Sequence, residues 1–408
     1  MTIAASSISR NKLLGIAGTG WMFDALDVGL VSFIMAALIK EWSLSPAQVG
    51  WLGVINSTGM ALGALLFGLL ADRMGRKKVF IITLLMFSIA SGLSAASTTL
   101  TMLLVLRFFI GMGLGGELPV ASTLVSESVP AHARGRFVVL LESFWAVGWI
   151  LAALIAYFII PSYGWRVALL LGALPAFYAI YLRLHLPDSG RFAPQTAARA
   201  SFSDNLAQLF APSYRRATLT LWILWFSVVF SYYGMFLWLP SVVVLKGFGL
   251  VKSFEYVLIM TLAQLPGYFS AAWLIERFGR KFVLITYLLG TALSAYFFGH
   301  AHSVAHLLIA GSMLSFFNLG AWGALYAYTP EQYPDAIRAT GAGTAAAIGR
   351  IGGIFGPLVP GFLFNPKTDI QAIFWVFCAV IVLGVTAVAL LGKETRGIEL
   401  IKGHSTPA

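Results

Sequence analysis

The sequence predicts an all-α integral membrane protein with 12 transmembrane helices in two six-helix bundles. Three observations predict this fold: the composition, apolar segments of membrane-spanning length, and an internal repeat. The chain of 408 residues is 59% hydrophobic and 11% charged, with a mean hydropathy of +0.85. Soluble domains carry about 25% charged residues, so this chain is expected to lie in a lipid bilayer.

The first six spans are apolar runs of about 20 residues, the length that crosses ~30 Å of hydrocarbon as a helix. The first run follows Arg10 and Lys12 and is too long for a signal peptide, which indicates a retained helix. The second and third runs flank the basic segment DRMGRKK (Asp72–Lys78). The predicted spans are 13–38, 48–70, 79–97, 101–126, 136–160 and 165–186.

The last six spans have the same length and character. The segment ERFGRKF (Glu276–Phe282) separates the second and third of them, and the single cysteine, Cys378, lies in the last, so no internal disulfide is possible. Helices are predicted because apolar runs this long do not alternate as barrel strands do. The predicted spans are 217–245, 254–274, 282–300, 304–329, 340–364 and 370–391.

Lys and Arg residues in the connections lie mostly on one side of the predicted bundle. Twenty of the 27 lie there, against five on the other side. The positive-inside rule therefore places both termini and the 188–216 connection in the cytoplasm of a multi-pass protein of the cell membrane. This distribution also accounts for the net charge of +11, so no nucleic-acid partner is expected.

An internal repeat divides the chain. DRMGRKK recurs as ERFGRKF after 204 residues, which is half of 408, and the same offset relates SESVPAHARG (Ser126–Gly135) to PEQYPDAIRA (Pro330–Ala339). Two matches at one offset predict two bundles in parallel orientation. We expect a first bundle over 1–187, a cytoplasmic linker over 188–216 and a second bundle over 217–408.

The repeated segments resemble motifs of the major facilitator superfamily, and the resemblance covers essentially the whole chain. GLLADRMGRKK (Gly68–Lys78) is similar to the signature between helices 2 and 3, and RFFIGMGLGG (Arg107–Gly116) to the fourth-helix motif. PDSGRF (Pro187–Phe192) is similar to a sugar-porter motif, with Gly190 where a proline is usual. This departure, and the sugar-porter residues missing elsewhere, weaken a sugar interpretation.

Two further resemblances concern the substrate. FDALD (Phe23–Asp27) is similar to the Asp-x-x-Asp of aromatic-acid/proton symporters, with Ala25 in place of the usual glycine. GGELPVASTLVSE (Gly115–Glu127) and LLESFWAVGW (Leu140–Trp149) most resemble bacterial niacin transporters, relatives of the animal organic-ion transporters. The resemblance implies proton-coupled uptake of nicotinate or a similar small aromatic carboxylate by alternating access.

Acidic residues within the spans belong to the first half. Asp24 and Asp27 lie three residues apart, so they project from one helix face near mid-bilayer. Both cannot ionise cheaply in a low dielectric, so at least one is expected to hold a proton. The alternative is a structural network with Arg107. The residues assigned to proton coupling, in which Asp27 is expected to matter more than Asp24, are Asp24, Asp27, Glu117, Arg107 and Glu142.

Arg350 is the intramembrane charge of the second half. Its guanidinium is permanently charged and can bind a carboxylate with two parallel hydrogen bonds. Gly349, Gly352 and Gly353 leave room around it. The resemblance to organic-anion transporters, which also place an Arg in this helix, supports anion binding. An ion pair between helices is the alternative.

Aromatic and amide residues could complete a pocket, although such aromatics often face lipid or pack within the bundle. In repeat coordinates Trp145 lies opposite position 349, next to Arg350. A flat ring could stack on Trp145 while its carboxylate meets Arg350. Its ring nitrogen could meet Asn318 or Gln264. The residues assigned to the substrate are Arg350, Trp145, Asn318, Gln264, Trp149, Trp322 and Tyr232.

The repeated loop motifs are expected to form a gate. A carboxylate at the end of a helix, such as Asp72, can pair with Arg or Lys. The resemblance implies that Asp72 contacts Arg134 and that Glu276 contacts Arg338, which latches the cytoplasmic gate when the protein faces outward. The alternative is that these charges only set topology. The assigned gate residues are Asp72, Arg73, Arg76, Glu127, Arg134, Glu276, Arg277, Arg280, Glu331 and Arg338.

No P-loop, HExxH or GxSxG motif occurs in a suitable context, so ATP drive and hydrolysis are not expected. We predict a secondary transporter, not an enzyme, of a small organic anion with H⁺, acting as a monomer without cofactor or metal. The alternatives are a benzoate-type aromatic-acid/proton symporter and a drug/proton antiporter. A membrane sensor or enzyme would need a soluble output domain or a nucleophile–base pair.

Overall fold

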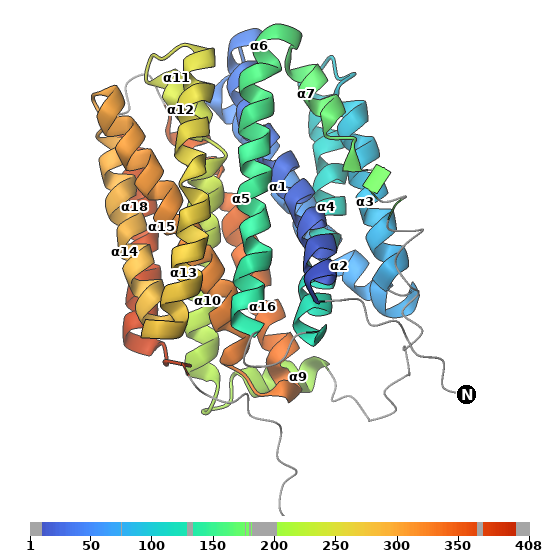
Figure 1. Cartoon of the computed structure of the whole chain (residues 1–408), viewed down its shortest axis with the longest axis vertical. Coiled ribbons are helices and arrows are strands. Elements are labelled where there is room, and N and C mark those ends of the chain that lie inside the picture. The colour runs from blue at the N-terminus through green and yellow to red at the C-terminus, as the bar shows by residue number, and fades with distance from the viewer. Residues whose placement is uncertain are drawn as a thin grey trace, which may run out of the picture.

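The computed structural model describes residues 10–74, 76–128, 134–175, 177–178, 181, 202–364 and 370–396. Within these ranges the regular structure is helical, and each of the twelve predicted spans contains helix. Most helices run along the long axis of the molecule, with the first half in blue to green on one side and the second half in yellow to red on the other (Figure 1). The predicted fold class is confirmed.

The helices of the first half are α1 (Arg10–Glu41), α2 (Pro46–Met74), α3 (Arg76–Ser94), α4 (Leu100–Ser128), α5 (Arg134–Phe158), α6 (Ile160–Tyr163) and α7 (Trp165–Leu171). Helix α9 (Phe202–Leu209) follows the first half and lies across one end of the molecule (Figure 1). We call this end the α9 end and the opposite one the α6 end. The bounds of the two bundles stay a prediction.

The helices of the second half are α10 (Arg215–Phe236), α11 (Leu239–Leu245), α12 (Leu250–Leu262), α13 (Gln264–Phe278), α14 (Arg280–Gly299), α15 (Val304–Glu331), α16 (Asp335–Phe355), α17 (Leu358–Leu363) and α18 (Ile370–Leu391). Three predicted spans here each consist of two helices. The interruptions lie at or just before Pro240, Pro266 and Pro357. Proline removes a backbone donor and clashes with the preceding turn, which breaks the helix.

Length and composition make this a multi-pass membrane protein. Nine helical segments in the described part of the chain are long and apolar enough to cross a membrane. Glycines allow the closest helix contacts. On α2, Gly59 and Gly63 lie against the backbone of α4, and Gly115 of α4 lies against the backbone at Met60. Small residues let membrane helices approach in this way, because lipid supplies little hydrophobic force between them.

The two halves meet along a seam. Helix α5 packs against α12, α13 and α15, while α2 packs against α16 and α17; Figure 1 shows α5 beside α13. At the α6 end the seam is tightly packed: Gly50 of α2 lies against Gly361, the Pro357 carbonyl and the Trp238 ring of the second half, and the Trp238 indole donates to the same carbonyl at 3.0 Å. Side chains from both halves therefore meet in the middle of the molecule, where the candidate site lies.

Candidate functional site

An aromatic cluster fills the middle of the seam. Trp145 of α5 and Trp322 of α15 are stacked, with ring centroids 6.5 Å apart and an angle of 18° between their planes. Tyr232 of α10 lies 4.8 Å from Trp322 and accepts a hydrogen bond from the Trp145 indole. Trp21 of α1 packs on Trp145 at 4.9 Å. Trp149, the next turn of α5, is fully buried. Both halves therefore contribute to this cluster.

Glu142 lies one turn before Trp145 on α5, and its carboxyl accepts a hydrogen bond from the Trp322 indole at 3.3 Å. It is 2% exposed. The Trp21 ring packs on Trp145, one turn further along α5, the Tyr326 ring centroid is 5.9 Å from that of Trp322, and Tyr268 lies against Gly323, the residue after Trp322. The described groups around this carboxyl are thus indoles and phenols.

Two buried amides lie near the cluster. Gln264 begins α13 one turn before Tyr268, and Asn318 lies one turn before Trp322 on α15, so both are on the α6 side. Both side chains are fully buried, and their amide atoms have no hydrogen-bond partner among the described residues. Buried polar groups in folded proteins are nearly always paired. These amides are therefore available to a ligand or to water.

Arg350 of α16 lies among donors that share a weak acceptor. Its Nη1 is 3.8 Å from the sulfur of Met60 on α2. The Asn56 amide is also 3.8 Å from that sulfur, and the Tyr233 hydroxyl is 3.9 Å from it. A thioether is a poor acceptor, so a carboxylate among these three donors would be bound far better. Sequence reasoning missed Asn56 and Tyr233, although an amide in the middle of an apolar span is a detectable signal.

The two aspartates of α1 have different surroundings. Asp27 forms an ion pair with Arg107 of α4 at 2.8 Å, and the two side chains are 1% and 2% exposed. Asp24 acts electrostatically on Tyr233, as does Arg350. The structural alternative considered for Asp27, a pair with Arg107, is therefore what the structure contains. Asp24 is the aspartate that lies near the Arg350 donors.

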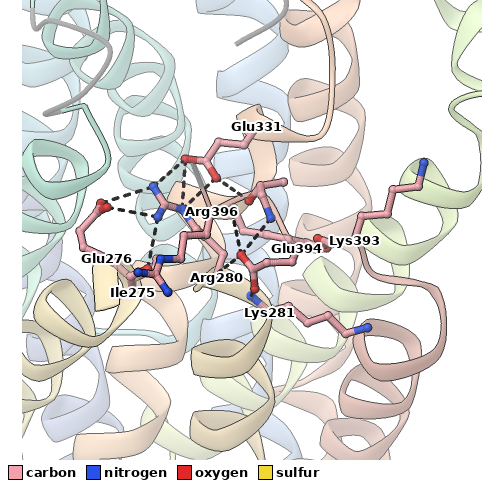
Figure 2. A network of polar contacts seen from close by, with 10 residues as sticks. Ile275, Glu276, Arg280, Lys281, Glu331, Lys393, Glu394 and Arg396 are labelled. Atoms are coloured by element: carbon pink, nitrogen blue, oxygen red, sulfur yellow. Dashed lines mark hydrogen bonds and ion pairs between the residues drawn. The ribbon is translucent and has the colours of Figure 1, made fainter. Parts of the chain in front are cut away.

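A polar network joins three segments at the α9 end (Figure 2). Arg280, which begins α14, contacts Glu276 at 3.2 Å and Glu331 at 3.0 Å. Thr395, which follows α18, donates its hydroxyl to Glu331 at 2.6 Å. Glu394 accepts from the backbone N–H of Arg280 at 2.8 Å. The end of the chain after α18 is thus tied to the repeated loop motif, an arrangement that sequence reasoning did not predict.

Several predicted gate contacts have other partners. Glu276 pairs with Arg280 rather than with Arg338, which donates to two backbone carbonyls at 3.0 and 3.2 Å. One of these carbonyls belongs to Pro330 near the end of α15, and the other belongs to Tyr333 in the short connection before α16. Arg277 lies over the Trp273 ring at 5.1 Å. The remaining predicted positions lie outside the side chains that the structure describes, namely Asp72, Arg73, Arg76, Glu117, Glu127 and Arg134.

A cavity of about 300 Å³ lies at the α6 end, among loop and helix-end residues of the second half that include Lys246, His302 and Gln371. Lys246 donates to the carbonyls of Gly299 and Ala301, each at 3.1 Å. A lysine at this position satisfies carbonyls left free at the end of α14. The cavity borders a structural contact, and we do not count it as the candidate site.

A polar and aromatic site in the seam of two repeated helix bundles is typical of membrane transporters. The chain belongs to the Major Facilitator Superfamily, whose sequence profile matches residues 18–270 and 256–405. The predicted superfamily is therefore confirmed, and so is the prediction that the chain is not an enzyme, because its relatives are named as transporters.

Among its relatives, the chain is 66% identical to a Bacillus subtilis protein provisionally named niacin/nicotinamide transporter NiaP, over 96% of this chain and 98% of that protein. It is 49% identical to the niacin transporter NiaP of Acinetobacter baylyi, over 94% of each chain. Its fold is similar to that of the Escherichia coli xylose transporter XylE, with a TM-score of 0.77 and 18% identity, covering 96% of this chain and 99% of that one.

Proposed function

We propose that this protein carries nicotinate, or a similar small aromatic carboxylate, across the cell membrane together with protons. One observation carries the proposal. Arg350, Tyr233 and Asn56 direct donors at the sulfur of Met60, where a carboxylate would be the better acceptor. The resemblance to proteins named as niacin transporters supports the same substrate class.

The aromatic cluster suits the ring of such a substrate. Two parallel rings that hold a third between them need about 7 Å, twice the ~3.5 Å contact distance of carbon atoms. The ring centroids of Trp145 and Trp322 are 6.5 Å apart and their planes are nearly parallel, so a flat ring would lie between them once an outward movement of one indole had opened that spacing between the planes. Because these two residues come from opposite halves, a bound ring would contact both bundles at once. The amides of Gln264 and Asn318 would offer further polar contacts.

Proton coupling is assigned to Asp24. An ionised Asp24 and a substrate carboxylate would compete for the one guanidinium of Arg350, whereas a protonated Asp24 would leave it to the substrate. Uptake of a proton by Asp24 would therefore favour binding of the anion, which links the two in one transport step. Asp27 is neutralised by Arg107, and we assign it a structural role.

The orientation proposed from the charge distribution places the α9 end in the cytoplasm, with both termini. We propose bundles over 1–187 and 217–408, joined by the linker 188–216, in a protein that works as a monomer by alternating access. The Arg280 network then lies on the cytoplasmic side. There it would hold the loop between α13 and α14 against α15 and the segment after α18. Its hydrogen bonds and ion pairs would have to break when the second bundle rearranges.

Glu331→Gln is expected to change the transport rate several-fold while leaving nicotinate affinity within about twofold. The reason is that the change weakens the charge-assisted contact to Arg280 at the α9 end, remote from the aromatic cluster. Arg277→Gln is the matched control, because Arg277 lies in the last turn of α13, next to Glu276, but its guanidinium lies over the Trp273 ring. Initial rates of nicotinate exchange in proteoliposomes measure the effect. An unchanged rate in Glu331→Gln would leave the network with a role in stability alone.

The proposed function is tested by thermal shift of the purified protein with nicotinate, benzoate, nicotinamide, a cationic drug and xylose. A ligand of the folded state raises the melting temperature by mass action. Nicotinate is expected to give the largest shift. A proton gradient directed inward, with the acidic side outside, is expected to drive its accumulation in proteoliposomes. A shift with the cationic drug but not with the acids would favour drug/proton antiport and contradict the proposal.

A further inference from the structure

We infer that Glu142 donates a hydrogen bond to the ring nitrogen of the substrate and so selects a pyridine carboxylate over a benzene carboxylate. The inference rests on the proposed function, because it needs an aromatic acid in the seam. To the proposed function the inference adds the residue that distinguishes two acids of the same size, shape and charge. Arg350 and the stacked indoles cannot make that distinction, because benzoate presents the same carboxylate and a similar flat face.

The position of Glu142 carries the first step. Its carboxyl accepts from the Nε1 of Trp322 at 3.3 Å, and the Trp322 ring is one of the two stacked walls of the aromatic cluster. Trp145, the other wall, lies one turn further along the same helix as Glu142. A ring held between Trp145 and Trp322 would therefore present its edge near the Glu142 carboxyl.

The surroundings of Glu142 carry the second step. The described groups around it are neutral: the Trp322 indole that donates to it, the Trp21 ring packed on Trp145 and, on α13 and α15, the phenols of Tyr268 and Tyr326, on which it acts electrostatically. A carboxyl at 2% exposure with no cation beside it is cheaper to hold as the neutral acid than as the anion. Neutral Glu142 carries an O–H donor as well as the oxygen that accepts from Trp322.

The third step is the match between two ends of a ligand. Glu142 and Arg350 both act electrostatically on Tyr326, so both groups belong to the surroundings of this one residue in the seam. A substrate with an anion at one end and a hydrogen-bond acceptor on its ring would satisfy both. The nitrogen of a pyridine carboxylate is such an acceptor. Benzoate places a C–H there and would leave the Glu142 donor unpaired, which is costly in a buried site.

The test compares four acids by isothermal titration calorimetry of the purified, full-length protein: nicotinate, benzoate, and the isomers picolinate and isonicotinate. The wild type is expected to prefer nicotinate over benzoate by roughly 10- to 100-fold. The two isomers carry the nitrogen at other ring positions and are expected to bind like benzoate.

Two substitutions of nearly equal volume separate the donor from the shape. Glu142→Gln keeps an N–H donor and is expected to keep most of the preference. Glu142→Met removes the donor. Its affinity for nicotinate is expected to fall by about the factor by which the wild type prefers nicotinate to benzoate, while its affinity for benzoate changes by no more than about threefold. Asn318→Leu, made for comparison, is expected to weaken both acids alike and so to keep their ratio. Melting temperatures verify that each variant is folded.

The outcomes distinguish this inference from the function on which it rests. If the wild type binds neither acid, the proposed function fails. If it binds nicotinate and benzoate equally, or if Glu142→Met keeps the preference, Glu142 does not read the ring and the proposed function stands. Loss of the preference in Asn318→Leu but not in Glu142→Met would assign the ring nitrogen to the amide and overturn the inference.

Discussion

Arg350→Lys is expected to lower nicotinate affinity roughly 30- to 1,000-fold, although the charge is kept. A lysine ammonium is a point donor and cannot reproduce the paired hydrogen bonds of a guanidinium to a carboxylate. The loss of that charge-assisted contact corresponds to about 2–4 kcal/mol. Tyr233 and Asn56 also direct donors at the Met60 sulfur, as Arg350 does. These two donors would remain in the variant, but neither can bind both carboxylate oxygens as a guanidinium does.

Nicotinamide separates an anchoring role from a structural one. It has the same ring without the anion, so it should bind the wild type more weakly and lose much less in Arg350→Lys and Arg350→Ala. Calorimetric titration of both ligands, with the melting temperature of each variant, measures this. An equal loss for both ligands together with a collapsed melting temperature would show that Arg350 supports the helix packing and does not anchor the substrate.

Asp24→Asn and Asp27→Asn are expected to fail in different ways. Asp24→Asn should abolish nicotinate accumulation driven by a pH gradient and keep exchange at equal concentrations, because an amide has the shape of the acid but releases no proton. Asp27→Asn should lower the free energy of unfolding by about 3–5 kcal/mol, since it leaves the buried charge of Arg107 uncompensated. That pair is 2.8 Å long and nearly inaccessible to solvent.

Proteoliposome uptake with and without an imposed pH gradient, and thermal unfolding in detergent, distinguish the two. Arg107→Gln combined with Asp27→Asn is the matched control, because removing both charges should recover part of the lost stability. Full accumulation by Asp24→Asn would remove Asp24 from the coupling role. Failed accumulation by a well-folded Asp27→Asn would return that role to Asp27.

The helical architecture could be predicted from the sequence because each of its causes is local in the chain. Apolar runs of about 20 residues have one stable form in lipid, since a helix satisfies its own backbone donors and acceptors. The repeat of DRMGRKK as ERFGRKF is likewise visible in the sequence. The prolines are also a local signal for the helix breaks near Pro240 and Pro266, because proline disrupts the turn before it. The predicted spans were nevertheless continuous there and missed both breaks.

The sequence by itself also determined which residues are unusual: buried acids, a buried arginine, and aromatic residues at helical spacing. Only the tertiary structure decided their partners. Asp24 and Asp27 are equivalent in sequence, yet Asp27 meets Arg107, 80 positions away, while Asp24 acts electrostatically on Tyr233, as Arg350 does. A charge in a low dielectric is governed by the groups within a few ångströms of it. Those groups come from distant helices, whose rotation and depth depend on packing across the seam and not on the local sequence.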